Sequence, residues 1–280
     1  MPAYDSGFKI AARISGRQLA DVAMSPVDEW LPVVSEVQTA ERFADRAFRA
    51  RRGSEWFVVY LEAYTYWRKE APWNLLAKSG LLSERERLPT VCLVYVLRPR
   101  GYNPQQGRFQ LEVEGETSQF LRLKEICLWQ VEPQPWWEEV PGLMALYPLC
   151  RHGRPAKQAV AYATGAITAA TADTIIRADL LTTLAIFGKL AYRQLDVMGL
   201  IGREHMKESA LYAEIGDEAR VETAQADVLA VLEERFGGQA AASCRDAVQR
   251  VTNQDKLRRL LRMAVRCATI EAFQRGLRTR

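Results

Sequence analysis

The chain has 280 residues, of which 48% are apolar and 26% are charged, and its net charge is +4. This balance is ordinary for a folded globular protein and excludes a disordered chain. No apolar stretch reaches the roughly 20 residues that span a bilayer, and residues 1–9 lack the apolar segment of an export signal. We therefore expect a cytoplasmic protein without a membrane partner. The five cysteines lack the spacing of a zinc or redox site, so we expect buried thiols in a reducing compartment.

The first half of the chain predicts a mixed central β-sheet flanked by helices. Two β-rich runs joined by a turn that contains Gly53 are typical of an antiparallel hairpin. A helix that starts at Pro72 and stops before Leu88-Pro89 is followed by a continuous apolar run, which indicates a strand parallel to the hairpin and buried on both faces. A second hairpin turns at Glu114-Gly115-Glu116. The strands are expected at residues 43–50, 56–64, 91–97, 108–113 and 121–128.

The second half of the chain predicts helices. Prolines between residues 133 and 155 favour loops and short helices there. A first helix is expected at about residues 8–19, and a second begins at a cap formed by Thr171 or Asp173. Two more helices are expected at residues 204–236, with a stop at Gly237-Gly238, and at residues 255–273. We divide the chain into a core of residues 1–150 and an all-helical region of residues 151–280, whose last helix is basic.

The positive charge is concentrated at the end of the chain. Residues 241–280 contain ten Lys or Arg against three Asp or Glu. Arg258, Arg262 and Arg266 recur at helical spacing, so they either follow DNA phosphates or form the solvated face of an amphipathic helix, and the second interpretation is favoured. The helix from 204 is also a candidate for self-association into a homo-oligomer.

Asp45 and Glu62 are the residues that point to chemistry. Tyr60, Glu62 and Tyr64 alternate along one strand and therefore share a face of the sheet. If the hairpin register sets Asp45 across from Glu62, two carboxylates converge, with Glu36 or Glu41 as further contributors. Paired carboxylates are the ligands that Mg²⁺ prefers, and such a metal activates water for attack on a phosphodiester.

Other side chains receive weaker interpretations. The aromatic residues near the second hairpin strand either stack on unpaired bases or pack the sheet, and packing is favoured for Trp73. These residues are Tyr60, Tyr64, Tyr66, Trp67 and Trp73. His152 and His205 have no partner at the spacing of a metal site or a catalytic triad, and we assign them no role.

Several short motifs follow one another along the chain in a characteristic order. They are Ala44-Asp45-Arg46-Ala47-Phe48-Arg49, Tyr60-Leu61-Glu62, Gly80-Leu81-Leu82, Leu88-Pro89, Leu97-Arg98-Pro99, Trp129, residues 141–149 and residues 206–237. Their order and spacing resemble the Rpn family of recombination-promoting nucleases and putative transposases, also called YhgA-like, which belongs to the PD-(D/E)XK nuclease superfamily. The resemblance implies a restriction-endonuclease-like core, a DNA substrate and a Mg²⁺ or Mn²⁺ cofactor.

The resemblance also implies three site residues. Asp45 and Glu62 fall on the two metal-binding acids, and Tyr64 falls on the third catalytic position, where the superfamily has Lys or Gln. A tyrosine hydroxyl donates a hydrogen bond but carries no positive charge at neutral pH. Two hypotheses follow: a metal-dependent DNA endonuclease in which another group replaces the missing cation, or a catalytically inactive fold that binds DNA or protein.

Overall fold

The computed structural model of the chain describes residues 3–23, 25–33, 46–102 and 107–278. It contains two compact units, Met1–Leu211 and Tyr212–Arg280. The expected mixed sheet flanked by helices, with a helical region after it, is confirmed. Among the described helices, none is long and apolar enough to cross a membrane.

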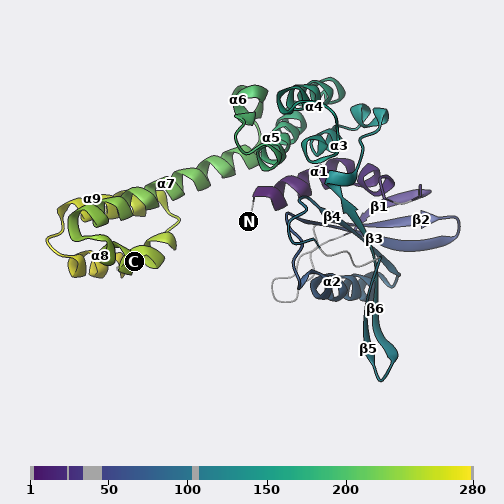
Figure 1. Cartoon of the computed structure of the whole chain (residues 1–280), viewed down its shortest axis with the longest axis horizontal. Coiled ribbons are helices and arrows are strands. Elements are labelled where there is room, and N and C mark those ends of the chain that lie inside the picture. The colour runs from purple at the N-terminus through teal and green to yellow at the C-terminus, as the bar shows by residue number, and fades with distance from the viewer. Residues whose placement is uncertain (1–2, 24, 34–45, 103–106, 279–280) are drawn as a thin grey trace. The chain divides into compact units, whose positions relative to one another are not determined.

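A six-stranded sheet with the order β1-β2-β3-β4-β6-β5 forms the centre of the first unit (Figure 1). Strand β4 is parallel to both of its neighbours, β3 and β6, whereas the other pairs are antiparallel. The strands are β1 (Glu29–Val33), β2 (Arg46–Arg52), β3 (Glu55–Tyr64), β4 (Thr90–Val96), β5 (Arg108–Val113) and β6 (Glu116–Cys127).

Both predicted hairpins are present. In the first, Gly53 takes a positive φ of 59° at the turn, and Arg46 lies opposite Leu61 at the far end of the ladder. In the second, Glu114 and Gly115 have φ values of 56° and 83°, the positive values that a two-residue type I′ turn requires. Strand β6 starts directly after this turn at Glu116 rather than at Leu121, because the polar residues between them also pair with β5.

Helix α2 (Ala71–Glu86) covers one face of the sheet and connects β3 to β4. Pro72 lies in its first turn, as predicted, and Arg87 ends it with a φ of 57°. Leu75 and Leu82 are fully buried against the strands. The core on this face also contains Ala47, Val58, Tyr60, Trp67, Ala71, Cys92, Val94, Val96, Leu121 and Leu123.

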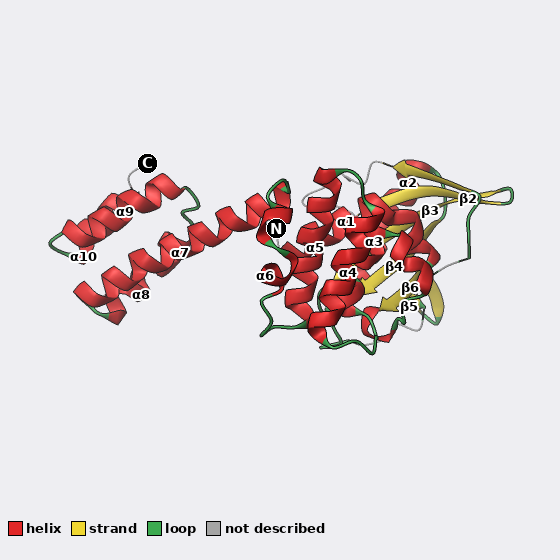
Figure 2. Cartoon of the chain, turned by 90° about the horizontal axis from the view of Figure 1, so that it is seen from above, coloured by secondary structure: helices red, strands yellow, loops and turns green. Residues whose placement is uncertain are grey.

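Helix α1 (Ala3–Asp21) packs on the opposite face, against β2 and β3. Phe8 is fully buried and its ring centroid lies 5.2 Å from that of Tyr95. The Tyr95 hydroxyl donates a hydrogen bond to the Leu19 carbonyl, which ties the end of α1 to the sheet. Helices α3 (Pro141–Met144), α4 (Ala156–Ala170) and α5 (Thr174–Ala191) extend this layer beside the sheet (Figure 2).

The helices of this layer match the sequence expectations only in part. Asp173 caps α5 as predicted, since its Oδ1 accepts hydrogen bonds from the Ile175 and Ile176 amides at 2.9 and 3.0 Å. Helix α4 falls in the region predicted to be helical, although no separate helix was delimited there. The proline-rich segment forms short helices, as predicted. The short helices of the first unit, besides α3, are the 3₁₀ helices η1 (Leu128–Gln130), η2 (Pro135–Glu139), η3 (Tyr147–Leu149) and η4 (Arg203–Met206) and the α-helix α6 (Val197–Ile201).

The second unit is helical and has its own core, centred on Val228, Leu232, Leu257 and Phe273. The long helix begins later than predicted but ends, as expected, before Gly237, whose φ is 83°. The predicted last helix is two helices with a break between them, and α8 was not expected. The helices are α7 (Ala210–Phe236), α8 (Gly238–Gln249), α9 (Gln254–Arg266) and α10 (Ile270–Arg278).

Along the chain, the boundary between the compact units falls between Leu211 and Tyr212. We expected a division after residue 150, where the sequence changes from strands to helices. The physical reason for the difference is that α3 and α5 pack on α1, so the helices after residue 150 share the core of the sheet.

Close packing of α3 on α1 predicts a stability difference between two glycines. A Cβ at Gly142 would overlap Ser15 of α1, so Gly142→Ala should cost about 1–3 kcal/mol of unfolding free energy. A Cβ at Gly80 in α2 would meet nothing within 4 Å, so Gly80→Ala should stabilise by about 0.5–1 kcal/mol. Urea unfolding followed by tryptophan fluorescence measures both, because all seven tryptophans belong to the first unit. Equal effects of the two substitutions would contradict this packing.

Candidate functional site

Glu62 lies near the end of β3, on the face that α2 covers, and only 6% of its surface is exposed. Both of its carboxylate oxygens accept hydrogen bonds. The Tyr60 hydroxyl donates to Oε2, and the Lys78 ammonium of α2 donates to Oε1 at 2.6 Å. The predicted strand parity is therefore correct, because Tyr60 and Glu62 share a face.

The Glu62–Lys78 pair is largely withdrawn from water, with 8% and 12% of the two side chains exposed. Burying either charge alone would be costly, so each charge depends on the other. Burial, with the negative charge of Glu62 adding to it, holds the pKa of Tyr60 well above its usual value. Tyr60 therefore keeps its proton and acts as a permanent donor to the carboxylate.

Two adjoining hollows open beside Glu62. One, of about 230 Å³, is bordered by Glu62, Tyr64 and Arg68, and the other, of about 320 Å³, is bordered by Lys189 and Arg193. The two hollows share Tyr4, Thr65 and Tyr66 in their walls.

Three cations surround these hollows, and we call Arg68, Lys189 and Arg193 the basic rim. All three side chains are exposed. Within the residues that the structure describes, no carboxylate lies at ion-pair distance from any of them. An unneutralised basic rim around a hollow favours the binding of an anionic ligand.

The predicted site residues are only partly placed by the structure. Asp45, like Glu36 and Glu41, lies outside the described residues. Tyr64 ends β3, is half-buried, borders the smaller hollow and stands edge-on to Trp67 with ring centroids 6.0 Å apart. Glu62 and Tyr64 are thus brought to one hollow.

The structure adds three residues that sequence reasoning missed: Lys78, Lys189 and Arg193. Lys78 had a detectable signal, because it lies three residues after the buried Leu75 and so shares the inward face of α2. No local pattern could have linked Lys189 and Arg193 to Glu62, since the link depends on how α5 packs.

The chemistry of Glu62 fits one carboxylate ligand of a divalent metal. Each oxygen accepts one hydrogen bond from the protein and keeps a further lone pair. In the described part of the chain, however, no three His, Cys, Asp or Glu side chains gather as a ready-made metal site.

Trp73 and His152, which the sequence analysis also considered, pack against aromatic side chains in the structure. Trp73 is 54% exposed although its ring stands edge-on to Phe109, so the expected packing is incomplete. His152, to which we assigned no role, packs among tyrosines: its ring stacks on Tyr147 with centroids 4.7 Å apart, and its Nε2 lies 3.0 Å from the Tyr192 hydroxyl oxygen. Burial lowers the pKa of His152, which favours its neutral form.

The arginine stripe of the second unit lies on the outer face of α9. Arg258, Arg262 and Arg266 are exposed, while Leu257 and Leu260 are buried in the core of that unit. This arrangement agrees with an amphipathic helix that docks through its leucines.

Comparisons of the chain with protein-family models, with curated proteins and with solved structures found no match.

The buried pair predicts non-additive losses of stability. Glu62→Gln and Lys78→Met should each cost about 3 kcal/mol, because each leaves the opposite charge buried without a partner. The double variant should cost clearly less than the sum. Glu132→Gln is the control, since Glu132 pairs with Arg151 on the surface and should cost less than about 1 kcal/mol. Urea unfolding of all four variants makes the comparison, and additive single losses would contradict the coupling.

Proposed function

We propose that the first unit is a divergent, metal-dependent DNA endonuclease of the PD-(D/E)XK type, which hydrolyses phosphodiester bonds. The observation that carries the proposal is the Lys78 ammonium 2.6 Å from the Glu62 carboxylate. In the family that the chain resembles, the position of Tyr64 holds a Lys or a Gln. Here Lys78 of α2 supplies a positive charge beside Glu62. We further propose a cytoplasmic location, because the free thiols of all five cysteines suit a reducing compartment.

Asp45 and Glu62 are the proposed ligands of a Mg²⁺ or Mn²⁺ ion. When bound, this metal would activate a water molecule and neutralise charge on the scissile phosphate. Asp45 lies outside the described residues. The hairpin as described ends at Arg46, whose partner on β3 is Leu61, the neighbour of Glu62.

Each described residue has a proposed task. Tyr60 fixes the orientation of Glu62 through its hydrogen bond, and Lys78 places a positive charge where negative charge develops on the phosphate. The basic rim holds neighbouring phosphates of the DNA. Tyr64 contributes at most a hydrogen bond from its hydroxyl.

The second candidate is an inactive fold that binds DNA or protein, and a specific observation favours it. Lys78 already neutralises Glu62, so the acid is stable without a metal. In this case the pair is a remnant that holds α2 on the sheet. The chain would then bind its partner through the basic rim, or associate with itself through the long helix α7 (Ala210–Phe236).

A plasmid-cleavage assay with a titration of Mg²⁺ or Mn²⁺ tests the proposal. Asp45→Asn, Glu62→Gln and Lys78→Gln should each lower the cleavage rate by roughly 10²-fold or more, because each removes a metal ligand or a transition-state charge. Glu84→Gln is a matched control, since Glu84 is exposed on α2 and should leave the rate unchanged.

The outcomes separate the two candidates. Cleavage that is unchanged in both acid variants would overturn the endonuclease assignment. Absence of both cleavage and metal binding in the wild type, measured by calorimetry, would favour the inactive binding fold. Circular dichroism of each variant checks that the lost activity is not lost folding.

The basic rim predicts a change in the salt dependence of DNA binding. Lys189→Gln with Arg193→Gln should weaken binding of a short duplex and lower the slope of log K against log salt by about 2, near 0.9 for each lost phosphate contact. The control is Arg203→Gln with Lys207→Gln, which removes the same charge from two exposed residues outside the rim. Binding measured without divalent metal separates this effect from cleavage. A slope that both double variants lower equally would argue against a role of the rim.

A further inference from the structure

A second group of unneutralised cations lies on the β5–β6 hairpin. Arg122 and Lys124 alternate along β6 with the buried Leu121 and Leu123, so they face away from α2. Arg108 of β5 lies directly opposite Arg122. We call Arg108, Arg122 and Lys124 the basic strip. All three are exposed, and none has a carboxylate at ion-pair distance among the described residues.

The cations of the basic strip repel one another when no anion is bound. Like charges that face each other across an antiparallel pair destabilise the pair, as Arg108 and Arg122 do. Lys124 follows Arg122 on the same face, about 6.6 Å further along the strand. A row of anionic groups at similar spacing would relieve this repulsion, and successive phosphates of a nucleic-acid strand form such a row.

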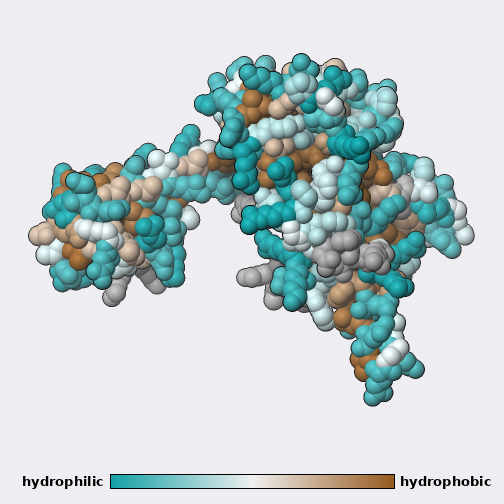
Figure 3. Space-filling view, in the orientation of Figure 1, coloured by the Kyte–Doolittle hydropathy of each residue, from teal (hydrophilic) through white to brown (hydrophobic). Residues whose placement is uncertain are grey.

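Phe120 adds an apolar element to the same face. It precedes Arg122 by two residues, and 54% of its surface is exposed. Apolar surface is visible over the protruding β5–β6 hairpin in Figure 3. An exposed aromatic ring beside cations is the combination that stacks an unpaired base and holds its phosphates, whatever the base is.

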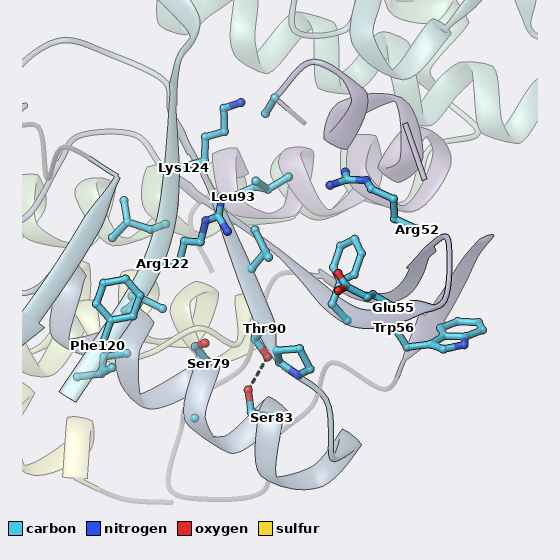
Figure 4. Close-up of a pocket in the computed structure, with 18 of the residues that line it drawn as sticks. Arg52, Glu55, Trp56, Ser79, Ser83, Thr90, Leu93, Phe120, Arg122 and Lys124 are labelled. Atoms are coloured by element: carbon cyan, nitrogen blue, oxygen red, sulfur yellow. Dashed lines mark hydrogen bonds between the residues drawn. The ribbon is translucent and has the colours of Figure 1, made fainter. Parts of the chain in front are cut away.

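A hollow of about 980 Å³ borders the strip and extends to the starts of β3 and β4, and α2 also lines it through Leu76, Ser79, Gly80 and Ser83. Figure 4 shows Phe120, Arg122 and Lys124 in succession along one strand, with Arg52 on the opposite side of the hollow. Arg52 is fixed there, because its guanidinium donates to the Ser25 carbonyl at 2.7 Å. Glu55 is the acidic residue in this wall, so positive charge prevails in the hollow.

We propose that this face binds an unpaired nucleic-acid strand, with phosphates on the basic strip and a base on Phe120. An unpaired strand is favoured over a duplex because the bases of a duplex are already stacked and cannot reach the ring. The face is distinct from the Glu62 site, since the hollow meets β3 at Glu55–Phe57, the end of the strand opposite Glu62. Binding here does not require that the chain cleave DNA.

Fluorescence anisotropy of a labelled oligothymidine about 12 nucleotides long, in EDTA, tests the proposal on the full chain. The wild type should bind this strand more tightly than a duplex of equal length. Phe120→Ala should weaken binding roughly 5- to 100-fold, the range for loss of one stacked base. Replacing all three residues of the basic strip by Gln should lower the slope of log K against log salt by about 2, near 0.7 for each contact to a single strand.

Matched variants locate the effect. Trp73→Ala removes an equally exposed aromatic side chain from the α2 side and should leave binding unchanged. A triple variant with Gln at Arg258, Arg262 and Arg266 removes the same charge from α9. It should leave the slope of log K against log salt unchanged. Any of three results would overturn the proposal: tighter binding of the duplex than of the single strand, binding of polyglutamate as tight as that of the oligothymidine, or weaker binding of the strand in the α9 variant alone. Because EDTA removes the divalent metal, strand binding is measured without cleavage, so failure of the nuclease assignment is seen separately in the plasmid assay.

Discussion

The parallel pairing of β3 with β4 determines how the first unit is organised. Two parallel neighbours cannot be joined by a tight turn, so the chain must cross over a face of the sheet, and α2 is this crossover. The helix buries Leu75 and Leu82 on the strands and holds Lys78 above Glu62. The polar contact is thus a consequence of the apolar one, because the packing of α2 fixes the height and rotation at which its lysine meets the sheet.

The carboxylate and the ammonium are costly to withdraw from water, because apolar residues of similar size would pack in that interface without this cost. The Glu62 carboxylate is restrained from two directions, since Lys78 donates to one of its oxygens and the Tyr60 hydroxyl donates to the other. The hollow beside Glu62 adjoins the hollow that Lys189 and Arg193 border, because both hollows share Tyr4, Thr65 and Tyr66 in their walls.

Much of the fold could be predicted because its signals are local. The hairpin around Gly53, the apolar run of β4 and the Asp173 cap each appear within a few residues. Helix α4 was missed although its buried residues, Ala159, Val160, Ala163 and Ile167, recur at helical spacing. The break near Cys267 was missed because no Gly or Pro marks it. Site residues on α2 and α5 depend on packing between distant segments, which one sequence does not encode locally. The acid on β3 was found because strand parity alone sets its direction.

The order of the strands has a consequence for the behaviour of the protein in solution. An edge strand offers unpaired backbone groups to which another polypeptide can add, and this is a common route to aggregation. The edge strand β1 contains Pro32, which has no amide hydrogen to donate, and the other edge strand, β5, has only six residues and carries Arg108 and Glu112. Both borders of the sheet that the structure describes therefore carry features that disfavour the addition of a further strand.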